Sequence, residues 1–278
     1  MSILVFTLIL LAGAFIAGML GSLTGLGGGV VIIPLLTLIF HVDIRYAVGA
    51  SLVASIANSS GAAAAYIKEG ITNVRIGMFL EIATTTGAIV GAILAVYTPT
   101  HLVAILFGFV LLFSAAMTLR KKNEHGSNDS NSKLASIMRL NSSYPVNGQE
   151  VPYKVSGVAG GYVLMTVAGV VSGLLGIGSG ALKVLAMDGV MRIPFKVSTT
   201  TSNFMIGVTA AASAVIYLQR GYIDPGIAMP VVLGVLAGAF GGSKLLMKLN
   251  TRKLRLLFCV VISALALEMI YNGFTGKL

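Results

Sequence analysis

Long apolar runs without charge constrain this chain more than any other feature. The windows 3–24, 100–119 and 157–175 contain no Asp, Glu, Lys or Arg. About twenty such residues in a helix cross a hydrocarbon core roughly 30 Å thick. Only 10% of the 278 residues are charged, whereas a soluble globular domain carries about 25%. A surface this poor in charge does not suit water, so the chain is predicted to be an integral membrane protein.

Hydropathy and helix breakers divide the chain into two halves of five apolar segments each. The segments lie near 3–24, 29–40, 46–67, 76–97 and 100–119, and near 157–175, 180–191, 197–218, 226–247 and 253–272. Between the halves, Arg120 to about Ser156 is rich in Asn, Ser and charge, a composition that cannot bury a core. We therefore expect a first transmembrane repeat at 1–119, a cytoplasmic linker at 120–156 and a second transmembrane repeat at 157–278.

Glycine clusters precede the two shortest segments. One cluster comprises Gly25, Gly27, Gly28 and Gly29, and the other comprises Gly176, Gly178, Ser179 and Gly180. The segments that follow, 29–40 and 180–191, have about a dozen residues, which is too few to span a bilayer. The pattern predicts a helix that breaks at each cluster and a short helix that turns back. Non-helical backbone at membrane depth is tolerated only where it is buried or lines a cavity, so each break indicates a site.

The two halves are related by a shift of 151 positions. At this shift Gly25, Gly27 and Gly29 fall on Gly176, Gly178 and Gly180, and Ser51 falls on Ser202. Each half is expected to hold three spanning helices, an odd number, so the second repeat must run opposite to the first. The predicted fold is an all-α polytopic membrane protein of two inverted repeats, each with a glycine-broken re-entrant helix pair plus three spanning helices. This architecture is common in secondary transporters.

The distribution of positive charge predicts the orientation. With the linker in the cytoplasm, 15 of the 19 Lys and Arg residues lie inside and three outside, while Lys183 lies on a short helix. Cytoplasmic loops of membrane proteins are enriched in Lys and Arg. Both termini are then predicted to be external. Basic loops beside the lipid bilayer account for the net charge of +10, and no nucleic-acid partner is expected.

The broken helices and the polar runs beside them are candidates for an anion site. Helix ends at a break offer N–H groups and positive dipole ends to an anion. Ser51, Ser55 and Asn58 share one helical face in the first half, and Thr201, Ser202 and Asn203 lie in the matching segment of the second half. Neutral hydroxyls and amides can donate hydrogen bonds to a small anionic substrate. The alternatives are close helix packing for the glycines and interhelical hydrogen bonds for the polar side chains.

Two ionisable side chains fall within the apolar segments. Lys183 follows Gly180 by three residues, and a cation inside the bilayer normally faces a partner or a cavity. It either meets the substrate anion or extends to the cytoplasmic interface. Glu81 is a candidate for a proton-coupling carboxylate, although placement at the membrane interface is the favoured interpretation for both Glu81 and Glu268.

The sequence offers little for catalysis. No His, Cys, Asp and Glu residues have metal-ligand spacing, and the Walker A lysine motif is absent. Cys259 is the only cysteine and has no histidine near it. We therefore expect no metal, no cofactor and no enzymatic activity. The oligomeric state is left open.

Two stretches resemble a known family. Gly-Leu-Gly-Gly-Gly-Val-Val-Ile-Ile-Pro at 25–34 and Ser-Gly-Leu-Leu-Gly-Ile-Gly-Ser-Gly at 172–180 are similar to the sulfite exporter TauE/SafE family, also called the 4-toluene sulfonate uptake permeases. The resemblance implies a bacterial or archaeal plasma-membrane transporter of sulfite, sulfonates or sulfoacetate. By position, it implies a site at Gly25, Gly27, Gly28, Gly29, Pro34, Gly176, Gly178, Ser179, Gly180 and Ser202. Ser179 and Leu185 depart from the family pattern, where glycine and proline are usual.

Three hypotheses follow. The leading one is a secondary transporter, working as an exporter by alternating access, that binds a small sulfur-containing anion between the glycine breaks. The second is a passive anion channel on the same scaffold. The third is a membrane enzyme or an accessory protein that hands sulfur species to a partner.

Overall fold

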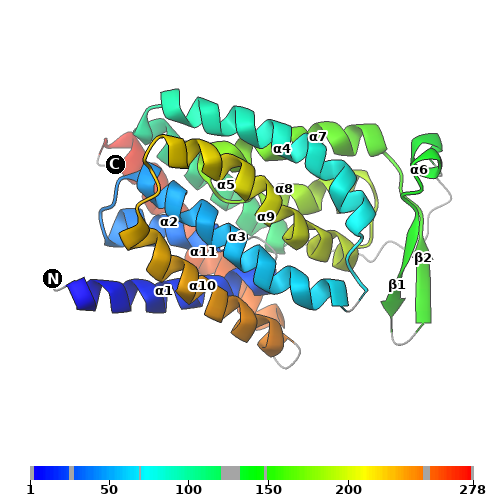
Figure 1. The fold of residues 1–278 in the computed structure, drawn as a ribbon, viewed down its shortest axis with the longest axis horizontal. Coiled ribbons are helices and arrows are strands. Elements are labelled where there is room, and N and C mark those ends of the chain that lie inside the picture. Colours follow the sequence, from blue (N-terminus) through cyan, green and yellow to red (C-terminus); the bar gives the residue numbers. More distant parts are fainter. Residues whose placement is uncertain are drawn as a thin grey trace.

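A computed structural model describes residues 3–24, 28–68, 70–119, 132–146, 149–246 and 251–276. The first half contains α1 (Ile3–Thr24), α2 (Gly29–Pro34), η1 (Leu35–Ile39), α3 (Ile44–Lys68), α4 (Val74–Tyr97) and α5 (Thr100–Leu119). Between the halves lie α6 (Lys133–Ile137), β1 (Ser142–Val146) and β2 (Gln149–Tyr153). The second half contains α7 (Val158–Leu175), α8 (Gly180–Val184), η2 (Leu185–Val190), α9 (Phe195–Gln219), α10 (Pro225–Leu246) and α11 (Thr251–Phe274). The elements form one bundle of helices (Figure 1), which confirms the all-α fold class.

The sequence repeat is also present in the element boundaries and the packing. Helices α3 and α9 have 25 residues each, and both begin at equivalent positions of the repeat. A side chain at Gly18 would overlap the carbonyl of Val235 in α10, and one at Gly169 would overlap the carbonyl of Thr84 in α4. The two contacts are equivalent in the repeat, because Gly18 corresponds to Gly169 and Thr84 to Val235 at the shift of 151. Each half therefore packs its first helix against the other half, α1 on α10 and α7 on α4. The opposite orientation of the repeats in the membrane stays a prediction.

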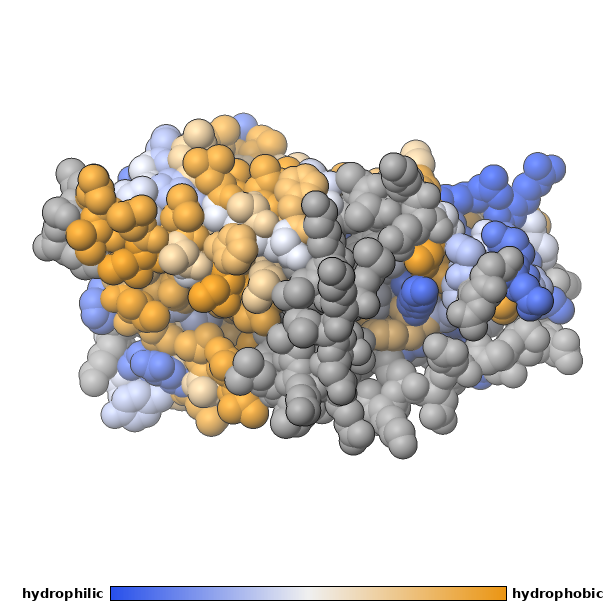
Figure 2. Space-filling view, turned by 90° about the horizontal axis from the view of Figure 1, so that it is seen from below, coloured by the Kyte–Doolittle hydropathy of each residue, from blue (hydrophilic) through white to orange (hydrophobic). Residues whose placement is uncertain are grey.

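The outer surface suits a lipid environment. Four described helices are long and apolar enough to cross a membrane, namely α1, α4, α7 and α9. They expose large apolar side chains such as Leu8, Ile82 and Val163. Figure 2 shows apolar residues over much of one face, whereas hydrophilic residues gather at the end that carries the β-hairpin in Figure 1. Exposed apolar side chains on this scale are compatible with hydrocarbon and not with water.

The two short segments form helices that are too short to span a bilayer, as predicted. Helix α2 continues into the π-helix η1, and α8 continues into η2, with eleven residues in each pair. At about 1.5 Å per residue such a pair covers about 16 Å, half of the hydrocarbon core. Pro34 has no N–H to donate to the helix and precedes η1. However, Leu185 stands at the equivalent position and η2 begins there too, so proline is not required for the change to π geometry.

The polar stretch between the halves differs from the expectation of a linker without a core. Residues 120–131 lie outside the described residues, but the remainder folds into α6 and an antiparallel β-hairpin. Leu140, Tyr153 and Val155 are buried in a cluster with residues of α4 and α7. The Asn73 side chain donates a hydrogen bond of 2.6 Å to the Tyr153 hydroxyl, and burial raises the pKa of Tyr153. The average composition of the stretch concealed these few apolar anchors, and its cytoplasmic location stays a prediction.

Candidate functional site

The second glycine break meets the first half of the chain at the crossing of α3 and α9. The Ser51 hydroxyl of α3 donates a 2.7 Å hydrogen bond to the Gly176 carbonyl. Gly29, the first residue of α2, lies so close that a Cβ would collide with the Ser51 hydroxyl and lie 3.0 Å from the Gly176 oxygen. The start of one short helix therefore faces the break that precedes the other. Contact between the two breaks requires the absence of a side chain at Gly29.

The second break owes its shape to three left-handed positions within four residues. Gly176 has a φ of 68°, Gly178 one of 66° and Ser179 one of 45°. Glycine adopts this region without strain, while a serine there is uncommon. A Cβ on Gly178 would also lie 2.8 Å from Ile206 of α9. Ser179, which stands where the family usually has glycine, thus adopts a backbone conformation that glycine would adopt with less strain.

Several hydroxyls of the predicted site are used for contacts between helices. Ser202 of α9 donates to the Gly180 carbonyl at 3.3 Å, and Ser59 of α3 donates to the Asn203 carbonyl at 2.5 Å. Thr201 accepts a 3.1 Å hydrogen bond from the backbone N–H of Asn73. These contacts place the polar faces of α3 and α9 inside the bundle. The hydroxyls of Ser51, Thr201 and Ser202 therefore make hydrogen bonds between helices, which is the alternative role considered for them.

A second group of polar side chains is buried without a partner among the residues that the structure describes. The unpartnered atoms are Ser55 Oγ, both amide atoms of Asn58, Ser172 Oγ, Ser179 Oγ and both amide atoms of Asn203. All five side chains are at most 3% exposed. Leaving a buried polar group unpaired costs about 1–3 kcal/mol, so such groups in a native protein require an explanation. They provide hydrogen-bond donors around the second glycine break and the facing surfaces of α3 and α9.

Lys183 belongs to a buried chain of polar groups. Its side chain is fully buried, and Nζ donates to the Thr209 hydroxyl of α9 at 2.5 Å. Thr209 in turn donates to Glu81 Oε1 of α4 at 2.6 Å. The alternative that Lys183 extends to the interface is thus wrong, because its ammonium group turns inward. Its partner is the hydroxyl of Thr209, with the carboxylate of Glu81 directly beyond.

Glu81 is also inside the bundle, contrary to its expected interfacial placement. Only 8% of the residue is exposed, and Thr85 donates a further hydrogen bond of 3.1 Å to Oε1. Its other oxygen, Oε2, has no hydrogen-bond partner among the described residues. Glu81 remains in the protein interior because a cation lies one hydroxyl away. Glu268, in contrast, is exposed.

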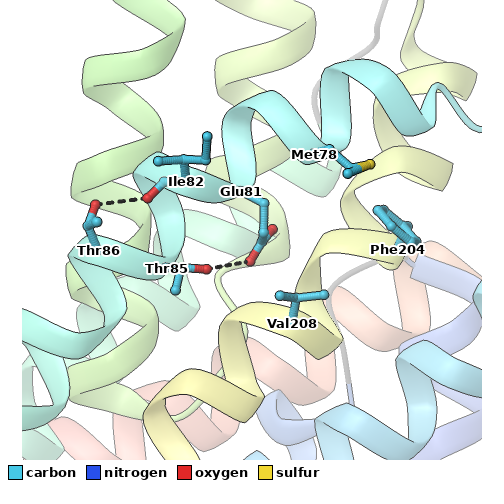
Figure 3. Close-up of a pocket in the computed structure, with 7 residues that line it drawn as sticks. All are labelled: Met78, Glu81, Ile82, Thr85, Thr86, Phe204 and Val208. Atoms are coloured by element: carbon cyan, nitrogen blue, oxygen red, sulfur yellow. Dashed lines mark hydrogen bonds between the residues drawn. The ribbon is translucent and has the colours of Figure 1, made fainter.

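A cavity of about 570 Å³ borders Glu81 (Figure 3). Its lining comprises Met78, Glu81, Ile82, Thr85, Thr86, Phe204 and Val208. Met78, Ile82 and Val208 are among the exposed apolar residues of α4 and α9. The carboxylate therefore lies at the polar inner wall of a cavity whose other walls are mostly apolar.

The charged residues break the repeat symmetry. At the shift of 151, Ile32 stands opposite Lys183 and Val232 opposite Glu81, while Asn58 stands opposite Thr209. The chain of Lys183, Thr209 and Glu81 therefore joins the second half to α4 of the first half, whereas the equivalent positions hold an unpartnered amide and two apolar side chains. The group beside the second break is charged, and its counterpart beside the first break is neutral.

The predicted site residues fall into three groups. Gly25 and Gly27 lie outside the described residues. Gly28, Gly29, Ser51, Asn58, Gly176, Gly178, Ser179, Gly180, Lys183, Ser202 and Asn203 lie at the two breaks or on the buried faces of α3, α8 and α9. Pro34 and Thr201 are buried at the end of α2 and beside the start of α4. Thr209 and Ser172 were missed. Thr209 follows Ser202 by seven residues and so shares its helix face, which was the available signal.

Metal-binding potential is limited in the described part of the chain. No group of three His, Cys, Asp or Glu residues lies close enough to hold an ion there. Cys259 is buried in α11, and its Sγ donates to the Ala115 carbonyl at 3.6 Å. The described residues can therefore act on a ligand through hydrogen bonds and through the charges of Lys183 and Glu81.

Comparisons with known proteins match this chain to one family of membrane transporters. The model of the sulfite exporter TauE/SafE family matches residues 10–269. The probable membrane transporter protein YunE of Bacillus subtilis is 30% identical over 95% of this chain and 97% of its own length. YdhB of the same organism, also a probable membrane transporter protein, is 26% identical over 83% of this chain and 86% of its own. The probable membrane transporter protein MJ0441 of Methanocaldococcus jannaschii is 24% identical over 96% of both chains. No solved structure matches.

Proposed function

Because this chain belongs to the sulfite exporter TauE/SafE family, we propose that it exports a small sulfur-containing anion, such as sulfite, a sulfonate or sulfoacetate, across the plasma membrane. It is a membrane transporter, and the substrate and direction are the proposed parts. The observation that carries the proposal is the set of buried, unpartnered hydroxyl and amide groups around the second glycine break, with Lys183 on the short helix that follows.

An oxyanion fits the chemistry of these groups. The amides of Asn58 and Asn203 and the hydroxyls of Ser55, Ser172 and Ser179 can all donate hydrogen bonds, and none of the five is charged. Uncharged donors can bind an anion and still release it, whereas several fixed cations would bind the anion too tightly for transport. Lys183 supplies one positive charge nearby. A sulfonate or sulfite group has three oxygens that can accept these hydrogen bonds.

The arrangement of the helices supports alternating access. In Figure 1, α1 starts at the end of the bundle marked N, while α7 starts at the opposite end, beside the β-hairpin. This is the relation expected of inverted repeats, whose rocking around a fixed midplane site exposes it to each side in turn. The cross-packing of α1 on α10 and of α7 on α4 would let these helices move as pairs. We propose that both termini are external and the β-hairpin cytoplasmic.

The test is transport by purified protein in proteoliposomes, with sulfite, methanesulfonate, sulfoacetate and taurine as probes. We expect saturable uptake of at least one sulfur anion, together with thermal stabilisation by the same anion in detergent. A bound ligand at about a hundredfold excess over Kd stabilises by about 2.7 kcal/mol. Flux that stays linear with concentration would indicate the channel instead. Failure of every probe to bind or cross would remove the sulfur anion from the proposal.

A further inference from the structure

We propose that Lys183 exchanges its counter-ion between Glu81 and the transported anion, so that each anion is carried together with one proton on Glu81. The proposal rests on the anion transport proposed above and adds its coupling ion. It is argued from the buried chain of Lys183, Thr209 and Glu81.

The first step is the geometry of the pair. The ammonium of Lys183 and the carboxylate of Glu81 contact the same hydroxyl oxygen, Thr209 Oγ1, at 2.5 and 2.6 Å. Lys183 is fully buried and Glu81 is 8% exposed. Since Thr209 has a single proton, donation to Glu81 leaves its lone pairs for Lys183. The ammonium of Lys183 and the carboxylate of Glu81 therefore neutralise each other through one hydroxyl group in the protein interior.

The second step is the position of Lys183 beside the proposed anion site. Lys183 follows Gly180, whose carbonyl accepts from Ser202, and its own N–H donates to the Ser179 carbonyl. Thr209 lies seven residues beyond Ser202 and so shares its face of α9. An anion held by the amide and hydroxyl groups of this region would come close to the ammonium group and compete with Glu81 for it.

The third step is the state of Glu81 after the exchange. A buried carboxylate that loses its cation is an uncompensated charge, which is strongly unfavourable in a low-dielectric interior. Protonation removes that charge. Oε1 already accepts from Thr209 and Thr85, whereas Oε2 has no partner among the described residues and is the atom on which the proton would sit. The proton comes from water on the side from which the anion enters, and it leaves when Lys183 returns. Anion and proton therefore move in the same direction, and export requires an outward anion gradient that exceeds any inward proton gradient.

Other ionisable groups do not offer the same exchange. On the described parts of the packed elements they are Tyr162 of α7, Lys196 and Tyr217 of α9, Asp188 of η2, Arg75 and Tyr97 of α4, His101 of α5, and Arg45 and Tyr46 of α3. Lys196 precedes Thr209 by thirteen residues, roughly 20 Å along a helix, and Tyr217 donates to the Gly173 and Leu174 carbonyls. Arg75 donates to the Arg139 carbonyl at the exposed end of α4. Asp188 lies on η2, while the hydrogen bond of Lys183 goes to Thr209.

The asymmetry of the repeats sets the stoichiometry. Ile32 and Val232 stand at the positions equivalent to Lys183 and Glu81. The described chain therefore holds one such charge pair at the two breaks. One exchanging pair predicts one proton for each anion.

The first experiment needs no substrate. Infrared difference spectra of the purified wild type, in which Lys183 neutralises Glu81, should contain no protonated-carboxyl band from Glu81. Lys183→Met should gain a protonated-carboxyl band, because the buried carboxylate has lost its cation, and Lys183→Met/Glu81→Gln should lack that band. Lys183→Met/Glu268→Gln, changed at an exposed carboxyl, is the matched control and should retain the band. Failure of Lys183→Met to gain the band would overturn the proposal.

The second experiment measures the exchange itself. Methanesulfonate is the probe because it remains ionised throughout the titration and releases no proton of its own. Its Kd should rise with pH in the wild type, by up to about tenfold per pH unit for one coupled proton, and should be independent of pH in Glu81→Gln. Thr209→Val should weaken this linkage and Thr209→Ser should retain it, as expected of a positioning residue. Binding with no pH dependence in the wild type would refute proton coupling and leave anion transport standing.

A third outcome separates the two proposals. If methanesulfonate, sulfite, sulfoacetate and taurine all fail to bind while the infrared linkage holds, the anion premise fails and the exchange fails with it. Lys183 and Glu81 would then be a structural ion pair.

Discussion

Replacement of Asn203 by leucine is expected to stabilise the protein and abolish anion binding at the same time. Both amide atoms of Asn203 are unpartnered, and the residue is 1% exposed. Its backbone carbonyl, which accepts from Ser59, is unaffected by the change. Leucine has a similar volume and no polar group. Asn203→Leu therefore removes two desolvated groups and keeps the packing between α3 and α9.

The magnitude follows from the cost of an unsatisfied buried polar group, about 1–3 kcal/mol. We expect the free energy of unfolding to rise by about 1–3 kcal/mol, with a corresponding increase of the melting temperature in detergent. The anion-induced shift expected of the wild type should disappear, because the amide that would donate to the ligand is gone. Stability rises as function falls, which is the opposite of an ordinary core mutation.

The control is Gln219→Leu on the same helix. Gln219 is exposed at the end of α9, so its replacement should change the free energy of unfolding by less than about 0.5 kcal/mol. A loss of stability in Asn203→Leu would refute the reasoning, since it would mean that the amide is paired within the folded protein. Retention of the anion-induced shift would remove Asn203 from the site.

Three further predictions concern the frame around the site. Gly29→Ala should prevent transport and lower the melting temperature, because its Cβ would collide with the Ser51 hydroxyl, and Ser51→Ala in the same chain should restore part of the loss. Tyr153→Phe should lower the free energy of unfolding by about 1 kcal/mol, since it removes the hydrogen bond from Asn73; an unchanged melting curve would contradict that role. In a cysteine-free background, Glu150→Cys in the exposed hairpin should react with an impermeant thiol reagent only from the cytoplasm, and Thr275→Cys only from outside. The reverse labelling pattern would invert the proposed topology.

The broad architecture could be predicted from the sequence because its signals are local and periodic. Uncharged windows of about twenty residues predict membrane helices, and two short segments after glycine clusters predict the non-spanning pairs. The shift of 151 predicts that α9 repeats α3, and the boundaries of the two helices agree with it. None of these inferences requires knowledge of which helix touches which.

The polar stretch between the halves shows the limit of composition. Its many Asn, Ser and charged residues predicted a chain without a core, yet Leu140, Tyr153 and Val155 are buried against the bundle. A few apolar side chains are enough when helices α4 and α7 provide the complementary surface. Composition averages over a segment, whereas burial depends on where single side chains meet another element.

The charged chain at the site was decided by tertiary packing alone. Glu81 and Thr209 are 128 residues apart, and Lys183 lies on a third element, so no spacing rule connects them. From the sequence, Lys183 was expected to meet either the substrate anion or the cytoplasmic interface, and Glu81 was expected at the interface. The packing of α4 and α8 against α9 brings the cation and the carboxylate to one hydroxyl. The sequence by itself determined that polar residues lie within apolar segments, and the fold determined their partners because contacts between distant helices depend on three-dimensional packing.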